Sequence, residues 1–193
     1  HIEDPTRATL RAGCDGIAAI NTIRSVLGVD LDTLRPEPSV EGYTTPGGYS
    51  CQAVMPIALR MCMEIAKVIR DEFPGRTLSG IGGIETGNDA AQFILLGCDT
   101  VQVCTGVMKF GYQIVKPMQE QLLAFMEKHK FNRLEDFKGH SLQFFTTHAD
   151  LVKRQTDARA AKKAEHERSK MIKADAEWDG DDFVKQTDAL ARG

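Results

Sequence analysis

The stretch from Ser79 to Gly106, SGIGGIETGNDAAQFILLGCDTVQVCTG, constrains the fold of this chain more than any other segment. It holds two apolar runs of strand length; the first ends in Gly82-Gly83 and the second in Cys104-Thr105-Gly106. A segment of helical length separates the runs, and strands joined by a helix pair in parallel through a right-handed crossover. Both runs therefore end at the same edge of a sheet, where parallel α/β folds bind their ligands.

The small residues at these two strand ends predict a phosphate-binding cup. Glycine allows a ligand to approach the backbone, and free amide N–H groups near a helix N-terminus hold a phosphate. In eight-stranded α/β barrels such a cup belongs to the loops after strands 7 and 8. The alternative is that Gly82 and Gly83 only allow a tight turn, and that Cys104 is a buried thiol at the end of an apolar strand.

Three strands, each followed by a helix, are expected up to about residue 130. The first helix is expected to have Asp4 as its N-cap and Pro5 as its first residue, and to stop at Gly13. Residues 24–52 form a long connection rich in Pro and Gly, and a loop of this length is usually functional. Hydrophobic periodicity predicts the other elements, which are strands at 16–20, 77–81 and 100–104 and helices at 53–71, 88–96 and 113–129.

Composition argues against several classes of protein. A formal net charge of −3 gives no reason to expect a nucleic-acid partner. The five cysteines contain no CxxC pair and the five histidines no HxH or HExxH spacing, so no metal or iron–sulfur site is expected. No apolar run reaches the roughly 18 residues of a membrane span, and the first residues do not resemble a signal peptide. We therefore expect a soluble, cytoplasmic protein with reduced thiols.

The last part of the chain differs in kind from the rest. Residues 150–173 are mostly Ala and charged residues, which favours a solvated helix or a segment ordered only against a partner. Residues 176–193 hold the only Trp and are expected to form a short amphipathic helix. Earlier in the chain, Asp30 and Asp32 are best explained by loop solvation or capping. No nucleophile beside a base is evident, so the chemistry is expected from a cofactor or from residues elsewhere.

Four short motifs carry a resemblance to a known family. Asn21-Thr22, GGYS at 47–50, GIGGI at 80–84 and QVCTG at 102–106 occur in family order. On these motifs, residues 1–140 resemble the C-terminal half of the FMN-binding barrel of dihydropyrimidine dehydrogenases, which is shared with class 1 dihydroorotate dehydrogenases. The resemblance implies an α/β fold, the (β/α)8 TIM barrel, of which this chain supplies roughly the C-terminal half. Residues 141–193 would then be a charged, mostly helical tail.

The resemblance also implies roles for individual residues. Asn21 and Thr22 would bind the pyrimidine ring, and an amide with both a donor and an acceptor suits its imide-like edge. The family commonly has Gly where this chain has Cys51. No catalytic residue is implied here, because the catalytic cysteine of the family belongs to the other half of the barrel. The residues implied to bind FMN are Gly48, Ser50 and Cys51 near the flavin, and Ile81, Gly82, Gly83, Cys104 and Thr105 at its phosphate.

The implied function is that of an FMN-dependent oxidoreductase acting on the C5–C6 bond of a pyrimidine such as uracil or thymine. NAD(P) would supply electrons through another domain or subunit, since the iron–sulfur cysteines of many dihydropyrimidine dehydrogenases are missing from this chain. The missing N-terminal barrel half or a partner subunit would cover the open edge strand, and a homo- or hetero-oligomer is expected. The alternatives are a class 1 dihydroorotate dehydrogenase, a phosphate-binding barrel isomerase or lyase, and a non-catalytic subunit.

Overall fold

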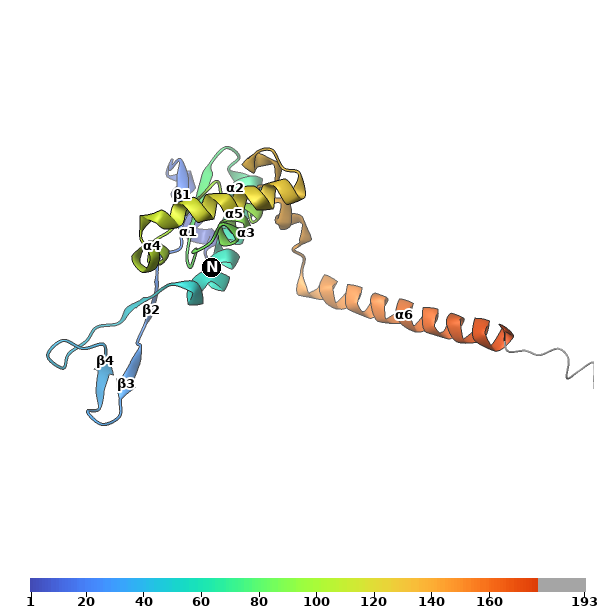
Figure 1. Ribbon diagram of the computed structural model, residues 1–193, viewed down its shortest axis with the longest axis horizontal. Coiled ribbons are helices and arrows are strands. Elements are labelled where there is room, and N and C mark those ends of the chain that lie inside the picture. Colours follow the sequence, from blue (N-terminus) through green and yellow to red (C-terminus); the bar gives the residue numbers. More distant parts are fainter. Residues whose placement is uncertain (177–193) are drawn as a thin grey trace, which may run out of the picture. The chain divides into compact units, whose positions relative to one another are not determined.

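The computed structural model describes residues 1–176, which fall into two units that divide after Phe144. The first unit is built on a three-stranded parallel sheet in the order β1-β6-β7. Strand β1 of this sheet is labelled in Figure 1. The register pairs Ala19 with Gly80 and Ile81 with Gln102. The predicted parallel pairing is therefore confirmed. The strands are β1 (Gly16–Ala19), β6 (Thr77–Ile81) and β7 (Thr100–Gln102).

Helices pack against this sheet. Among them, α2 contacts β1 and β6, α3 contacts β7, and α5 packs on α3. The buried residues of α2 recur at helical spacing, which is the pattern of a helix with one face in the core. The helices are α1 (Glu3–Arg11), α2 (Met55–Glu72), α3 (Gly87–Leu95) and α5 (Val115–His129).

The side chains of β6 alternate between the two faces of the sheet. Leu78 is buried, and a Cβ at Gly80 would lie 2.6 Å from the ring of Phe93, so the core leaves room only for glycine there. On the opposite face, the Ser79 hydroxyl accepts hydrogen bonds at 2.9 Å from the Thr100 hydroxyl and from Gln102 Nε2. One face of the sheet is therefore apolar and packed, and the other is polar.

Helix α1 begins before the predicted position. Its N-cap is Ile2, whose carbonyl oxygen accepts both the backbone N–H and the hydroxyl of Thr6, at 3.2 and 2.8 Å. Pro5 consequently lies inside the first turn, where its missing N–H has no helical acceptor to lose. The prediction that Asp4 is the N-cap is wrong, because the first helical hydrogen bond already ends at Ile2.

Helix α4 (Thr105–Phe110) was not predicted from the sequence; it follows β7 after Val103 and Cys104. Cys104 is the N-cap residue of α4 and is exposed. The interpretation of Cys104 as a buried thiol is wrong, because β7 already ends at Gln102 and the chain has left the core. The remaining short turns are the 3-10 helices η1 (Gln52–Val54), η2 (Tyr112–Ile114), η3 (Leu134–Asp136) and η4 (His140–Phe144).

The long connection after β1 contains two antiparallel ladders, which Figure 1 shows beyond the helices. The Asp30 carboxylate accepts the N–H groups of Asp32 and Thr33, both at 2.8 Å, which confirms the capping interpretation of Asp30. The bonds from Thr33 and Asp32 also lower the pKa of Asp30. The ladders pair β2 (Ile23–Ser25) with β5 (Gly47–Tyr49) and β3 (Gly28–Asp30) with β4 (Arg35–Glu37).

The second unit contains α6 (His148–Ala176), which includes the charged segment 150–173. Leu151, Met171 and Ile172 on this helix are exposed. The amphipathic helix expected at 176–193 falls, apart from Ala176, outside the described residues. None of the helices described for residues 1–176 combines the length and hydropathy that crossing a membrane requires.

Candidate functional site

A cavity of about 310 Å³ opens at the carboxyl ends of β1, β6 and β7, and all three strand ends contribute to it. It contains every predicted substrate or cofactor residue except Gly48. This is the edge at which parallel α/β folds bind ligands. The lining residues are Ile20, Asn21, Thr22, Ser50, Cys51, Val54, Ile81, Gly82, Gly83, Ile84, Glu85, Gln102, Cys104, Thr105 and Met108.

Gly48 lies next to this cavity rather than in its wall. It is in β5, opposite Arg24 of β2, and it lines a different pocket. A Cβ at Gly48 would overlap the Thr22 side chain. Gly48 therefore bears on the site through Thr22, against which its backbone packs.

Gly82 and Gly83 have conformations that favour glycine, with φ of +140° and +78°. A Cβ at Gly82 would lie 2.6 Å from Cβ of Ala58, and a Cβ at Gly83 would lie 2.8 Å from the Cys51 carbonyl oxygen. The turn and its packing against the start of α2 thus require glycine even without a ligand. Gly82 and Gly83 therefore form a tight turn and also line the cavity.

The backbone donors near the cavity differ in whether they are already used. At the start of α3, Thr86 and Asp89 form a capping box, and the Gly87 N–H donates to Gln121 Oε1 at 2.7 Å. In contrast, no acceptor within residues 1–176 pairs with the N–H groups of Gly82 or Gly83. The Gly82-Gly83 loop before α3 therefore carries two free donors, whereas the N–H groups of Gly87 and Asp89 in the first turn of α3 are already used. Free donors on such a loop fit a phosphate.

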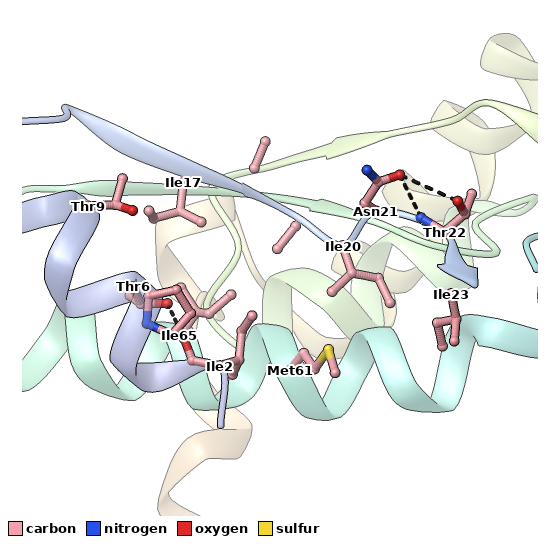
Figure 2. A pocket seen from close by; sticks show the side chains of 13 residues that line it. Ile2, Thr6, Thr9, Ile17, Ile20, Asn21, Thr22, Ile23, Met61 and Ile65 are labelled. Atoms are coloured by element: carbon pink, nitrogen blue, oxygen red, sulfur yellow. Dashed lines mark hydrogen bonds between the residues drawn. The ribbon is translucent and has the colours of Figure 1, made fainter. Parts of the chain in front are cut away.

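Asn21 and Thr22 follow β1 after Ile20, and Figure 2 shows them side by side. Asn21 Oδ1 accepts the Thr22 N–H at 2.8 Å, while Asn21 Nδ2 has no partner in the described part of the chain. Both residues are exposed. The amide thus presents a free donor at the cavity, and the peptide bond between Ala19 and Ile20 just before it is cis.

A second cavity, of about 350 Å³, lies along β1 and shares Ile20, Asn21 and Thr22 with the first (Figure 2). Within the described residues, β1 has a neighbouring strand on one side only, which is β6. The lining of this second cavity is mostly apolar. The large apolar side chains that line this second cavity are Ile2, Ile17, Ile20, Ile23, Met61 and Ile65.

Glu85, Cys51 and Lys109 form a cluster at the wall of the first cavity. Glu85 Oε1 is 2.6 Å from Lys109 Nζ and 3.4 Å from Cys51 Sγ, and the Glu85 side chain is only 8% exposed. The hydrogen bond to Glu85 is the main cause that raises the pKa of Lys109, and the hydrogen bond to Cys51 raises this pKa further. Cys51 has φ of +68°, which is a conformation that favours glycine.

The sequence analysis missed several lining residues. Gln102 could have been found from the alternation of β7, which places it on the same face as Thr100. Glu85 carried only a weak signal, its position two residues after Gly83, and Met108 had none because α4 was not predicted. The missed residues are Ile20, Val54, Ile84, Glu85, Gln102 and Met108.

The remaining cysteines give no sign of a metal centre. In the part of the chain that the structure describes, no three His, Cys, Asp or Glu side chains are grouped closely enough to hold a metal ion. Cys62 and Cys98 are buried in the core. Contact with the Cys62 thiol, together with burial, raises the pKa of Cys98, so this thiol stays protonated.

The parallel sheet and the cavity at its carboxyl edge agree with a comparison to known families. The family model of dihydroorotate dehydrogenase matches residues 2–126, and the chain belongs to this family. The chain is therefore a member of an α/β enzyme family, and its three parallel strands lie within the residues that match the family model.

Three relatives show how similar the chain is to individual members of this family. The chain is 59% identical over 190 residues to the chloroplastic dihydropyrimidine dehydrogenase (NADP(+)) of Arabidopsis thaliana, which covers 98% of this chain and 44% of the relative. It is 46% identical over 134 residues to the NAD-dependent dihydropyrimidine dehydrogenase subunit PreA of Escherichia coli, covering 68% of this chain and 32% of that subunit. The catalytic subunit of dihydroorotate dehydrogenase B (NAD(+)) from Pyrococcus horikoshii is 32% identical over 146 residues, which is 74% of this chain and 45% of the relative. The chain thus spans less than half the length of each of these relatives.

Proposed function

We propose that this chain is part of an FMN-dependent oxidoreductase of the dihydropyrimidine dehydrogenase type, which acts on the C5–C6 bond of a pyrimidine such as uracil or thymine. The observation that carries the proposal is the convergence of Asn21-Thr22, Gly82-Gly83 and Cys104-Thr105 on one cavity. The identity to two dihydropyrimidine dehydrogenases supports the same assignment.

The residues of the cavity suit FMN. The unpaired N–H groups of Gly82 and Gly83 would bind the phosphate, and the hydroxyl of Thr105 would add a donor. FMN, when bound, supplies hydride transfer, which no side chain can provide. Ser50 and Cys51 would lie along the cofactor, and the loop that carries them is held against Gly83. The protein's own contribution is therefore binding and orientation.

Asn21 and Thr22 would bind the pyrimidine. The free Nδ2 of Asn21 can donate to a ring carbonyl oxygen, and its Oδ1, which has two lone pairs, can accept from a ring N–H in addition to the Thr22 amide. Gly48 would keep Thr22 in place by packing against it. The acid that protonates the ring carbon is assigned to a part of the protein outside this chain, as is the route from NAD(P).

The open side of β1 supports a further proposal about the fold. We assign the apolar cavity along β1 to the contact with the rest of a (β/α)8 barrel, supplied by another part of the protein or by a partner subunit. Residues 141–176 would belong to the charged, mostly helical tail, and the rest of the tail expected at 141–193 lies outside the described residues. A cytoplasmic location stays a prediction, and the Arabidopsis relative is named chloroplastic.

Substitution of Asn21 tests the substrate assignment in the complete protein. Asn21→Ala is expected to lower kcat/KM for uracil reduction roughly tenfold to a hundredfold, because one or two hydrogen bonds to the ring are lost. The visible absorbance of bound FMN should not change. Asn132→Ala, at an exposed asparagine far along the chain, is the control. Unchanged turnover in Asn21→Ala would remove the substrate role.

Dihydroorotate dehydrogenase is the second candidate, and the matching family model and the Pyrococcus horikoshii relative favour it. Assays of the complete protein with dihydrouracil and with dihydroorotate separate the two activities. Oxidation of dihydroorotate alone would establish the second candidate. A colourless protein that binds no flavin would instead favour a barrel isomerase or lyase, or a non-catalytic subunit.

A further inference from the structure

The wall of the cavity carries a negative charge next to the proposed phosphate position. Of the residues that line the cavity in the described part of the chain, only Glu85 has a carboxylate, and none is Lys, Arg or His. Glu85 follows the Gly82-Gly83 loop by two residues, and its side chain is 8% exposed. A carboxylate with so little water around it is poorly screened, so it would repel a phosphate dianion strongly.

Lys109 is the cation that balances this charge. Its Nζ lies 2.6 Å from Glu85 Oε1, and its own side chain is 42% exposed. Lys109 belongs to α4 and follows Met108, which lines the cavity. The pair is therefore nearly neutral as seen from the cavity, although neither partner needs to touch the ligand.

We propose that the ion pair of Lys109 with Glu85 determines ligand specificity, because it allows the cavity to accept a phosphorylated flavin rather than the unphosphorylated one. This inference rests on the proposed function, since it concerns the phosphate of the same cofactor. Lys109 acts through Glu85, whose charge it neutralises, and it is not a catalytic residue.

Glu85 also makes a structural contact that is independent of its charge balance with Lys109. Glu85 Oε1 contacts Cys51 Sγ at 3.4 Å, so the carboxylate joins the loop before α2 to the loop after β6. Removal of the carboxylate alone would therefore loosen this contact but would also remove the repulsion. Removal of the lysine alone leaves the repulsion in place, which makes Lys109 the informative position.

The test measures the dissociation constants of FMN and riboflavin for the complete protein stripped of flavin, by quenching of flavin fluorescence. The quantity of interest is the Kd of riboflavin divided by the Kd of FMN. Lys109→Met is expected to lower this ratio roughly tenfold, because Glu85 is left without its counter-ion beside the phosphate. Lys109→Arg keeps the charge and should keep the ratio. The double variant Glu85→Gln/Lys109→Met should restore most of it.

Lys138→Met is the matched control. Lys138 Nζ lies 2.7 Å from a carboxylate oxygen of Asp99, and its side chain is 40% exposed, but this pair does not line the cavity. Lys138→Met should leave the ratio unchanged. Because the ratio compares two flavins on one protein, a general loss of stability does not alter it.

The outcomes separate the inference from the proposed function. A wild-type protein that binds neither flavin overturns both. A wild-type protein that prefers FMN, with the same ratio in Lys109→Met, overturns the inference alone. Failure of the double variant to recover the ratio also overturns it, since the effect of Lys109 would then not pass through Glu85.

Discussion

Gly87 lets α3 approach α5 closely. A Cβ at this position would overlap the carbonyl oxygen of Met118 and would lie 2.8 Å from the backbone nitrogen of Leu122. The Gly87 N–H also donates to Gln121 Oε1. A helix backbone cannot move aside as the end of a flexible side chain can, so the contact leaves little room for adjustment.

Substitution at this residue tests the packing. Gly87→Ala is expected to lower the free energy of unfolding by about 1–3 kcal/mol, because the added methyl group overpacks two helix backbones. Gly47→Ala is the control, since nothing lies within 4 Å of a Cβ there. Urea denaturation of the complete protein gives both values. Equal stability of the two variants would contradict the close approach of α3 and α5.

At the scale of an element, the N-terminus of α3 fixes the loop that enters the cavity. Thr86 Oγ1 accepts the Asp89 N–H at 3.1 Å, and Asp89 Oδ2 accepts the N–H groups of Glu85 and Thr86 at 3.1 and 2.9 Å. These bonds hold the first turn of α3 and, through Glu85, the end of the Gly82-Gly83 loop. The capping box therefore links the stability of a helix to the geometry of the site.

Asp89→Ala is expected to lower the free energy of unfolding by about 1 kcal/mol, the usual effect of losing a helix cap. Asn88→Ala changes an exposed neighbour on the same turn and should have a smaller effect. Thermal unfolding of the two variants side by side makes the comparison. If Asn88→Ala cost as much as Asp89→Ala, the capping box would not be the source of the stability.

At the scale of the whole molecule, the described residues leave one edge of β1 without a neighbouring strand. An edge strand with unpaired backbone groups and an apolar flank is a site for pairing. We expect that in the complete protein the amide hydrogens of β1 exchange as slowly as those of β6, as measured on the proteolytic fragments that contain each strand. Hydrogen exchange read by mass spectrometry measures this, with the exposed hairpin of β3 and β4 as the rapidly exchanging control. Fast exchange at β1 would contradict a covered edge.

Much of the fold could be predicted because its signals are local. The strand at 77–81 was found from an apolar run bounded by glycine, and α3 was found within one residue of its start. The strand expected at 100–104 was found at its start but ends already at Gln102. The misses were short or depended on context. Helix α4 has only six residues, and the two small ladders between β1 and α2 consist of three-residue strands, so neither has a clear period.

The sequence by itself determined the parallel βα order and the small residues at the strand ends, because hydrophobic periodicity and glycine positions are properties of short segments. Only the tertiary structure decided which of these residues share a cavity, that the Gly87 and Asp89 amides at the start of α3 are already occupied, and that Gly48 packs against Thr22. It also decided that Glu85 meets both Cys51 and Lys109. Those partners are 34 and 24 positions away along the chain, and their contact depends on how loops from separate elements fold against one another.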